Sequence, residues 1–172
     1  VYLNMRILFY YRESESIGIG YLMSLLKPAG HEVDLLFESA VSAKYGMIEF
    51  GFLKKLEKHE KLITSAREFD PDLLAFSSDY YLYPHVRKVA ETLKKELKIP
   101  TIMGGIQPSS APGNVLNDKF IDMICIGEGE GAMLELAETM ERGKEVSNIE
   151  NIWTRENGNL CTTPLRPMIE DL

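Results

Sequence analysis

The sequence predicts a doubly wound α/β domain whose five parallel strands follow the order 2-1-3-4-5, with a C-terminal β-hairpin after them. Short apolar runs alternate with helix-like segments, which is typical of a parallel sheet with right-handed crossovers. Near the end of the chain, Asn157 and Gly158 stand between two strand-like stretches. This pair supplies the positive φ angles of a tight hairpin turn.

The five predicted strands are short runs of apolar and aromatic residues. A strand covered by helices on both faces reads as a nearly continuous apolar run. Turn-forming residues, such as Asp70 to Asp72, separate these runs from the helices before them. The predicted strands are 6–11, 32–37, 73–77, 100–103 and 121–126.

The predicted helices place apolar residues at helical spacing between the strands. Ser16 is expected to cap the first helix, and Gly30 follows its end. Pro84 suits the first turn of a later helix. The predicted helices are 17–29, 53–69, 84–97, 111–118 and 133–140.

We expect residues 1–150 to form the α/β domain, and residues 151–172 to form the hairpin and the start of a linker. The hairpin strands are predicted at 152–156 and 159–163. Pro164 and Pro167 then indicate that the chain leaves the domain.

The composition argues against several classes of protein. The net charge of -7 argues against a nucleic-acid partner, whose phosphates demand a basic surface. No apolar run approaches the ~18 residues that a membrane helix needs, and the run 5–11 is too short for a signal peptide. We therefore expect a cytoplasmic protein. Cys125 and Cys161 are far apart, so they are expected to be reduced, small apolar residues without a metal.

The loops after four predicted strands are rich in small and polar residues. In an open α/β sheet, a ligand binds outside the carboxyl ends of the strands. Turn formation alone explains any one such loop, but four loops at one edge favour a pocket. The loops are Arg12 to Gly18, Ser77 to Tyr81, Gly104 to Ser110 and Gly127 to Gly131.

Other ligands of α/β folds fit these loops poorly. A dinucleotide fingerprint needs a third glycine where Met23 stands, and Glu128 and Glu130 would repel a pyrophosphate. Glu15 opposes a flavin phosphate loop in the same way. No lysine follows Ile126, as a phosphoacceptor receiver domain would require.

The three histidines offer no clear ligand or base. His31 opens the second strand at the amino edge, and we expect it to be structural or solvated. His59 lies on a charged helix face and is expected to be solvated. His85 follows the third strand on the correct edge, where a surface role is more common than a ligand role.

Three stretches of the chain resemble the cobalamin-binding domain that precedes the barrel of many radical S-adenosylmethionine enzymes. Gly18 to Val33 resembles its first helix and second strand, and Pro71 to Ser77 its third strand. Gly104 to Ser109 with Asp122 to Glu130 is similar to the family's GG-x-H-P-T…D-x-x-x-x-GEGE pattern, although Gln107 and Ser109 replace the histidine and threonine. Arg166 to Leu172 is similar to the linker that enters the barrel.

The resemblance implies that this chain binds cobalamin and catalyses nothing by itself. A barrel in the same polypeptide would hold the 4Fe-4S cluster and S-adenosylmethionine, for methyl transfer or related radical chemistry. Cobalamin mutases carry D-x-H-x-x-G after the first strand, but no histidine precedes His31 here. A bound cobalamin would therefore be base-off without a histidine ligand, its tail between strands one and three. The alternative is a degenerate domain that binds no cobalamin and serves as a structural or docking element.

No catalytic residue and no metal ligand is expected in this chain. The predicted cofactor-binding residues come from the four carboxyl-edge loops. They are Ser16, Gly18, Ser77, Ser78, Asp79, Tyr81, Gly104, Gly105, Ile106, Gln107, Pro108, Ser109, Gly127, Glu128, Gly129 and Glu130.

Overall fold

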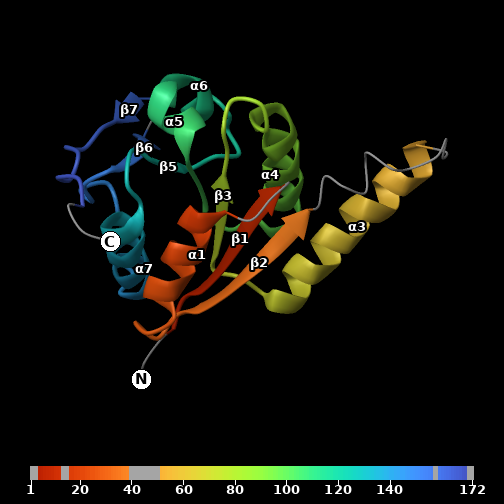
Figure 1. Ribbon diagram of the computed structural model, residues 1–172, viewed down its shortest axis with the longest axis horizontal. Helices are drawn as coiled ribbons and strands as arrows, with labels where there is room; N and C mark the ends of the chain where they lie inside the picture. Colours follow the sequence, from red (N-terminus) through yellow and green to blue (C-terminus); the bar gives the residue numbers. More distant parts are fainter. Residues whose placement is uncertain (1–3, 13–15, 39–50, 157–158, 170–172) are drawn as a thin grey trace.

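The computed structural model describes residues 4–12, 16–38, 51–156 and 159–169, with the backbone alone for 51–58 and Glu156. It is a three-layer α/β domain built on one sheet (Figure 1). Among the described residues, no helix is long and apolar enough to cross a bilayer.

The sheet has seven strands in the order β2-β1-β3-β4-β5-β6-β7. Its first five strands are parallel, in the predicted 2-1-3-4-5 order, whereas β6 and β7 run antiparallel. The strands are β1 (Arg6–Arg12), β2 (Glu32–Glu38), β3 (Leu73–Ser77), β4 (Thr101–Gly104), β5 (Met123–Cys125), β6 (Ile152–Glu156) and β7 (Asn159–Cys161).

The expectation of a five-stranded sheet with a hairpin beyond it was wrong. The β6–β7 hairpin pairs along β5, where Met123 lies opposite Thr154. It therefore extends the sheet and covers the open edge of β5. Its turn, at Asn157 and Gly158, lies outside the described residues.

Helices cover both faces of the sheet (Figure 1). Along β1, Ile7 and Phe9 face the layer that holds α1 and α7, while Leu8 and Tyr10 face α3 and α4. This alternation explains the unbroken apolar run of β1. The helices are α1 (Ile17–Leu26), α3 (Gly51–Phe69), α4 (Tyr83–Leu97), α5 (Ile106–Ser110), α6 (Pro112–Leu116) and α7 (Glu130–Glu141).

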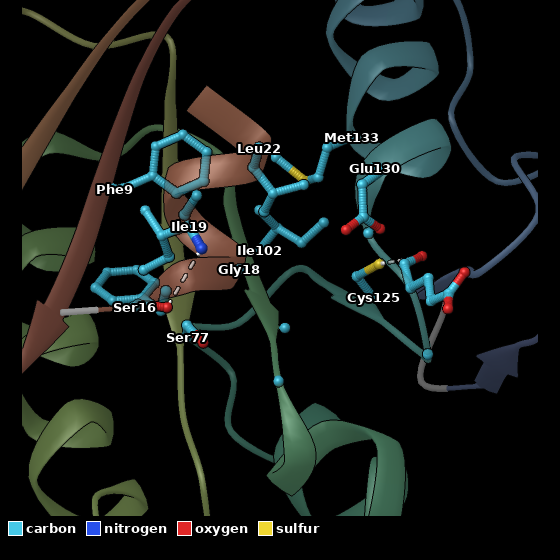
Figure 2. A pocket seen from close by; sticks show the side chains of 17 residues that line it. Phe9, Ser16, Gly18, Ile19, Leu22, Ser77, Ile102, Cys125, Glu130 and Met133 are labelled. Carbon is cyan, nitrogen blue, oxygen red and sulfur yellow. Dashed lines mark hydrogen bonds between the residues drawn. The ribbon is translucent and has the colours of Figure 1, made fainter. Parts of the chain in front are cut away.

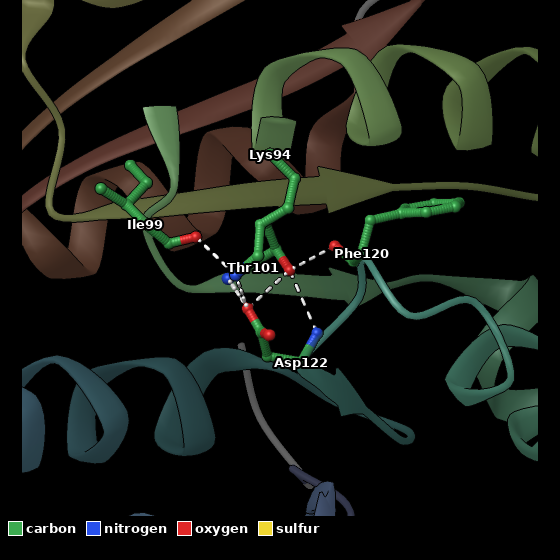
Figure 3. A network of polar contacts seen from close by, with 5 residues as sticks. All are labelled: Lys94, Ile99, Thr101, Phe120 and Asp122. Carbon is green, nitrogen blue, oxygen red and sulfur yellow. Dashed lines mark hydrogen bonds and ion pairs between the residues drawn. The ribbon is translucent and has the colours of Figure 1, made fainter. Parts of the chain in front are cut away.

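A polar network fixes β4 and β5 at their amino ends (Figure 3). One carboxylate oxygen of Asp122 accepts hydrogen bonds from the Thr101 N–H (2.7 Å) and the Thr101 hydroxyl (2.9 Å). The Lys94 ammonium donates to the same oxygen at 2.5 Å and to the Ile99 carbonyl at 2.8 Å. At this amino edge His31 is buried and accepts a hydrogen bond from the Met5 N–H, a structural role as expected.

Candidate functional site

A cavity of about 210 Å³ opens at the carboxyl ends of β1, β3, β4 and β5, between α1 and α7 (Figure 2). It lies where parallel α/β sheets hold ligands, because the loops diverge to the two faces there. Its walls come from four strands, two helices and the loops that join them. The lining residues are Phe9, Ser16, Gly18, Ile19, Leu22, Ala75, Phe76, Ser77, Ile102, Gly104, Gly105, Cys125, Gly127, Glu128, Gly129, Glu130 and Met133.

The interior of the cavity is apolar. Phe9, Ala75 and Ile102 project from neighbouring strands onto the face that α1 and α7 cover, and Leu22 and Met133 enter from those helices. Sequence reasoning missed these residues, because a strand residue beneath a cavity looks like a core residue. The period-two alternation that places Phe9, Ala75 and Ile102 on one sheet face was the signal available for the strand residues.

The rim of the cavity is made of loops in which glycine is required at one position. Gly105 has a φ of +100°, and a Cβ there would stand 2.7 Å from the Ser78 carbonyl oxygen. The Gln107 N–H donates to that same carbonyl at 3.0 Å, so the close approach is part of how the loops after β3 and β4 join. Gly105 thus lets two loops meet at the mouth of the cavity.

Ser109 links the loops after β4 and β5. Its hydroxyl donates to the Gly105 carbonyl at 3.0 Å and accepts from the Gly127 N–H at 3.0 Å. Ser16 closes the opposite side, where its hydroxyl caps α1 by accepting from the Ile19 N–H at 3.3 Å. The cap predicted at Ser16 is confirmed.

The β5–α7 end of the cavity carries its ionisable side chains, Cys125, Glu128 and Glu130. Burial raises the pKa of the Cys125 thiol to about 12, and the negative charge of Glu130 adds to the shift. A carboxylate oxygen of Glu128 accepts from the Ile169 N–H at 2.7 Å, and the Glu128 carbonyl accepts from the Asn151 amide at 2.9 Å. The segment after the hairpin is therefore bonded to the rim.

The structure brings nine of the predicted residues together around the cavity and leaves seven outside its lining. The nine are Ser16, Gly18, Ser77, Gly104, Gly105, Gly127, Glu128, Gly129 and Glu130. The seven are Ser78, Asp79, Tyr81, Ile106, Gln107, Pro108 and Ser109.

The seven outside residues have other surroundings. Ser78 is buried and donates to the Asp79 carbonyl, while the Asp79 carboxylate accepts from the Leu82 N–H before α4. Tyr81 and Ile106 are exposed, at 88% and 69%. Ser109 acts through the loop bonds described above.

Gln107 and Pro108 are buried within α5, which occupies a segment expected to be a loop. A turn of helix here draws their side chains into the domain. The short helix expected at 111–118 is α6.

No histidine lines the cavity among the described residues. The His85 ring nitrogen Nε2 lies 2.9 Å from a Glu38 carboxylate oxygen and 3.2 Å from the Tyr10 hydroxyl. Tyr10 faces the α3 and α4 layer, so His85 stands across the sheet from the cavity. In the part of the chain that the structure describes, no group of three or more potential metal ligands occurs.

An apolar cavity at the carboxyl edge, rimmed by glycine loops, defines a ligand-binding doubly wound domain. The sequence profile of the B12 binding domain matches residues 10–137, and this chain belongs to that family. The resemblance inferred from the glycine motifs is thus confirmed, and cobalamin is the cofactor of the family.

Relatives of this chain extend well beyond this domain. An uncharacterized methyltransferase of Pyrococcus horikoshii is 26% identical over 160 residues, covering 91% of this chain and 31% of that protein. The anaerobic magnesium-protoporphyrin IX monomethyl ester cyclase of Rubrivivax gelatinosus is 28% identical over 188 residues, covering 98% of this chain and 31% of that protein. The chain spans about a third of the length of these relatives.

Two solved structures share the fold. The radical S-adenosylmethionine methyltransferase TsrM from Kitasatospora setae, with cobalamin and a [4Fe-4S] cluster bound, superposes with a TM-score of 0.70 at 15% identity, over 97% of this chain and 30% of that one. The cobalamin-dependent S-adenosylmethionine radical enzyme OxsB, with aqua-cobalamin and S-adenosylmethionine bound, gives 0.73 at 13% identity, over 96% and 23%.

Proposed function

We propose that this chain is the cobalamin-binding unit of a radical S-adenosylmethionine enzyme. It holds its cofactor at the carboxyl edge, base-off and without a histidine ligand. The observation that carries the proposal is the apolar cavity of about 210 Å³ beneath the glycine-rimmed loops. An engineered apolar cavity of about 150 Å³ binds benzene. The present cavity therefore suits the aromatic benzimidazole of the cofactor's tail, whereas the much larger corrin ring must remain outside.

The exposed apolar side chains at the same edge support a corrin position above the cavity. Ile106 and Tyr81 follow β4 and β3, and both project into solvent although they are apolar or aromatic. Neither lines the cavity. We propose that they contact the corrin while Gly104, Gly105 and the loop after β5 allow its close approach.

Two observations support a lower cobalt face without a histidine. The sequence holds no histidine before His31, which lies at the opposite edge of the sheet. His85, the one candidate on the correct edge, is bonded to Glu38 and Tyr10 across the sheet from the cavity. A bound cobalamin would therefore meet no protein imidazole at its lower face, and the apolar cavity would hold the benzimidazole of its tail.

The chemistry of the parent polypeptide follows from the same assignment. A bound cobalamin supplies a cobalt centre that can take up a methyl group and pass it on. This chain's residues supply binding, orientation and exclusion of water around the tail. We propose that a barrel in the same polypeptide holds the 4Fe-4S cluster and S-adenosylmethionine, since the matching relatives are about three times as long as this chain.

Hydroxocobalamin binding tests the proposal. The protein is mixed with hydroxocobalamin and desalted, and the absorbance spectrum of the eluate is recorded. We expect co-elution of one equivalent with a base-off spectrum. After reduction, the EPR signal of the cobalt should lack nitrogen hyperfine splitting. A colourless eluate would favour the degenerate domain, and a nitrogen-split signal would overturn the unligated lower face.

A further inference from the structure

Glu130 places a carboxylate with an unsatisfied oxygen at the cavity. The residue opens α7, and its side chain lines the cavity beside Cys125 and Met133 (Figure 2). Its Oε2 atom is shielded from solvent, and among the described residues no donor lies within hydrogen-bonding distance of it. A buried acceptor without a donor is costly and is rare in folded proteins. This group therefore calls for an explanation.

The nearby Arg166 guanidinium does not donate a hydrogen bond to this oxygen. The Arg166 guanidinium comes so close to α7 that a Cβ at Gly131 would stand 2.8 Å from its Nη1. Its hydrogen bonds nevertheless go to the Glu135 carboxylate and to the Glu150 carbonyl. The positive charge is thus held beside α7 without pairing with Glu130.

The helix dipole alone does not explain why the Glu130 carboxylate has a buried oxygen. A carboxylate in the first turn of a helix is stabilised by the dipole, and water can solvate it fully there. One carboxylate oxygen of Glu130 is instead buried among protein atoms. The Cys125 thiol, which is 4% exposed, responds to this charge, because the charge of Glu130 adds to the rise of its pKa. The Glu130 charge is therefore felt at the Cys125 thiol, which lines the same cavity.

We infer that Glu130 accepts a hydrogen bond from a ribose hydroxyl of the cobalamin tail, and so selects corrinoids with a complete nucleotide tail. The inference rests on the proposed function. Of the tail's groups, the phosphate is anionic and would be repelled, and the benzimidazole offers a nitrogen acceptor but no N–H. The ribose hydroxyls are the neutral donors of its nucleotide part. The terminal torsion of Glu130 is broad, so its carboxylate can turn toward such a donor.

The test compares hydroxocobalamin with cobinamide in its aquo form, which lacks ribose and benzimidazole. Dissociation constants are measured for the wild type, Glu130→Ala, Glu130→Gln and the control Glu138→Gln. Glu138 lies on the same helix but pairs with Arg142. We expect Glu130→Ala to weaken hydroxocobalamin binding at least about tenfold and Glu130→Gln, which keeps an acceptor, about two- to fivefold. Cobinamide binding should change less than about twofold in all variants.

A second readout requires no ligand. If Oε2 lacks a partner in the free protein, Glu130→Gln should melt no lower than the wild type, because it removes an uncompensated buried charge. Equal losses for both corrinoids would place the donor on the corrin and overturn the assignment, as would unchanged affinities or a strongly destabilised Glu130→Gln. A wild type that binds neither corrinoid would instead refute the proposed function itself.

Discussion

The hydroxyl of Ser109 accepts a hydrogen bond from the N–H of Gly127, 18 residues along the chain, at 3.0 Å. It also donates to the Gly105 carbonyl at 3.0 Å. One side chain thus sets the spacing of two rim loops, although it does not line the cavity itself. This role was not visible in the sequence, where Ser109 was predicted to touch the ligand.

Ser109→Ala should loosen the rim and weaken hydroxocobalamin binding several-fold, because two hydrogen bonds worth about 1 kcal/mol each are lost. Ser109→Thr keeps the hydroxyl and serves as the matched control, with near wild-type affinity. Titration followed by absorbance measures both variants. Equal affinities for alanine and threonine would show that the loop bonds do not position the rim.

Gly105→Ala should lower the free energy of unfolding by about 1–3 kcal/mol, because alanine is strained at a φ of +100° and its Cβ would meet the Ser78 carbonyl at 2.7 Å. Gly113→Ala is the control, since no atom lies within 4 Å of a Cβ at that site. Urea unfolding compares the two. A Gly105→Ala chain as stable as Gly113→Ala would contradict the close approach of the two loops.

Stability should fall with rising pH above about 9 because of Cys125. The folded chain holds the thiol proton to a pKa of about 12, whereas the ordinary value is 9.0. The stabilisation is therefore complete below pH 9 and is lost as pH rises toward 12. Between pH 8 and 10 the loss should reach about 1.4 kcal/mol.

Urea unfolding of wild type and Cys125→Ala at several pH values checks this slope. The variant is expected to be less stable at pH 8, because a buried side chain is shortened, but its stability should depend less on pH. Parallel slopes in the two chains would rule out Cys125 as the source.

Asp122→Asn should destabilise the fold by about 1–3 kcal/mol, since one carboxylate oxygen serves Lys94 and both donors of Thr101. Glu91→Gln breaks only an exposed pair with Lys95 and should cost less than about 0.5 kcal/mol. The Asp122 network lies at the amino edge of the sheet. Hydroxocobalamin affinity should therefore be unchanged when it is measured under conditions where both proteins are fully folded. A loss of affinity would contradict the separation of the two edges.

Most of the sheet could be predicted because its central strands, β1, β3, β4 and β5, are buried on both faces. Ile7 to Tyr10 reads as an unbroken apolar run for that reason. The helix α5 was missed because Pro108 and Ser109 suggest a loop, and its first turn is joined to a distant loop by the bond from the Gln107 N–H to the Ser78 carbonyl. The pairing of the hairpin with β5 is equally non-local. No pattern within the hairpin specifies which edge it joins.

The rim of the site could be predicted, but the interior could not. Glycines such as Gly105 stand out in a sequence because few structural roles require them. Ala75 and Ile102 are indistinguishable from core residues until the loops above them diverge. Tyr81 and Ile106 stay predictions as ligand contacts, since they lie at the correct edge outside the cavity.

Ala75 gives direct access to the apolar cavity in which we propose that the cobalamin tail lies. Ala75 is buried, lines the cavity from β3 and can be enlarged to leucine. Hydroxocobalamin is titrated into wild type and Ala75→Leu, with thermal melting to establish that both are folded. We predict that the wild type binds one equivalent. The folded variant should bind at least tenfold more weakly, which is a loss of at least about 1.4 kcal/mol of binding free energy. Equal affinity in the two folded chains would contradict binding of the tail in this cavity.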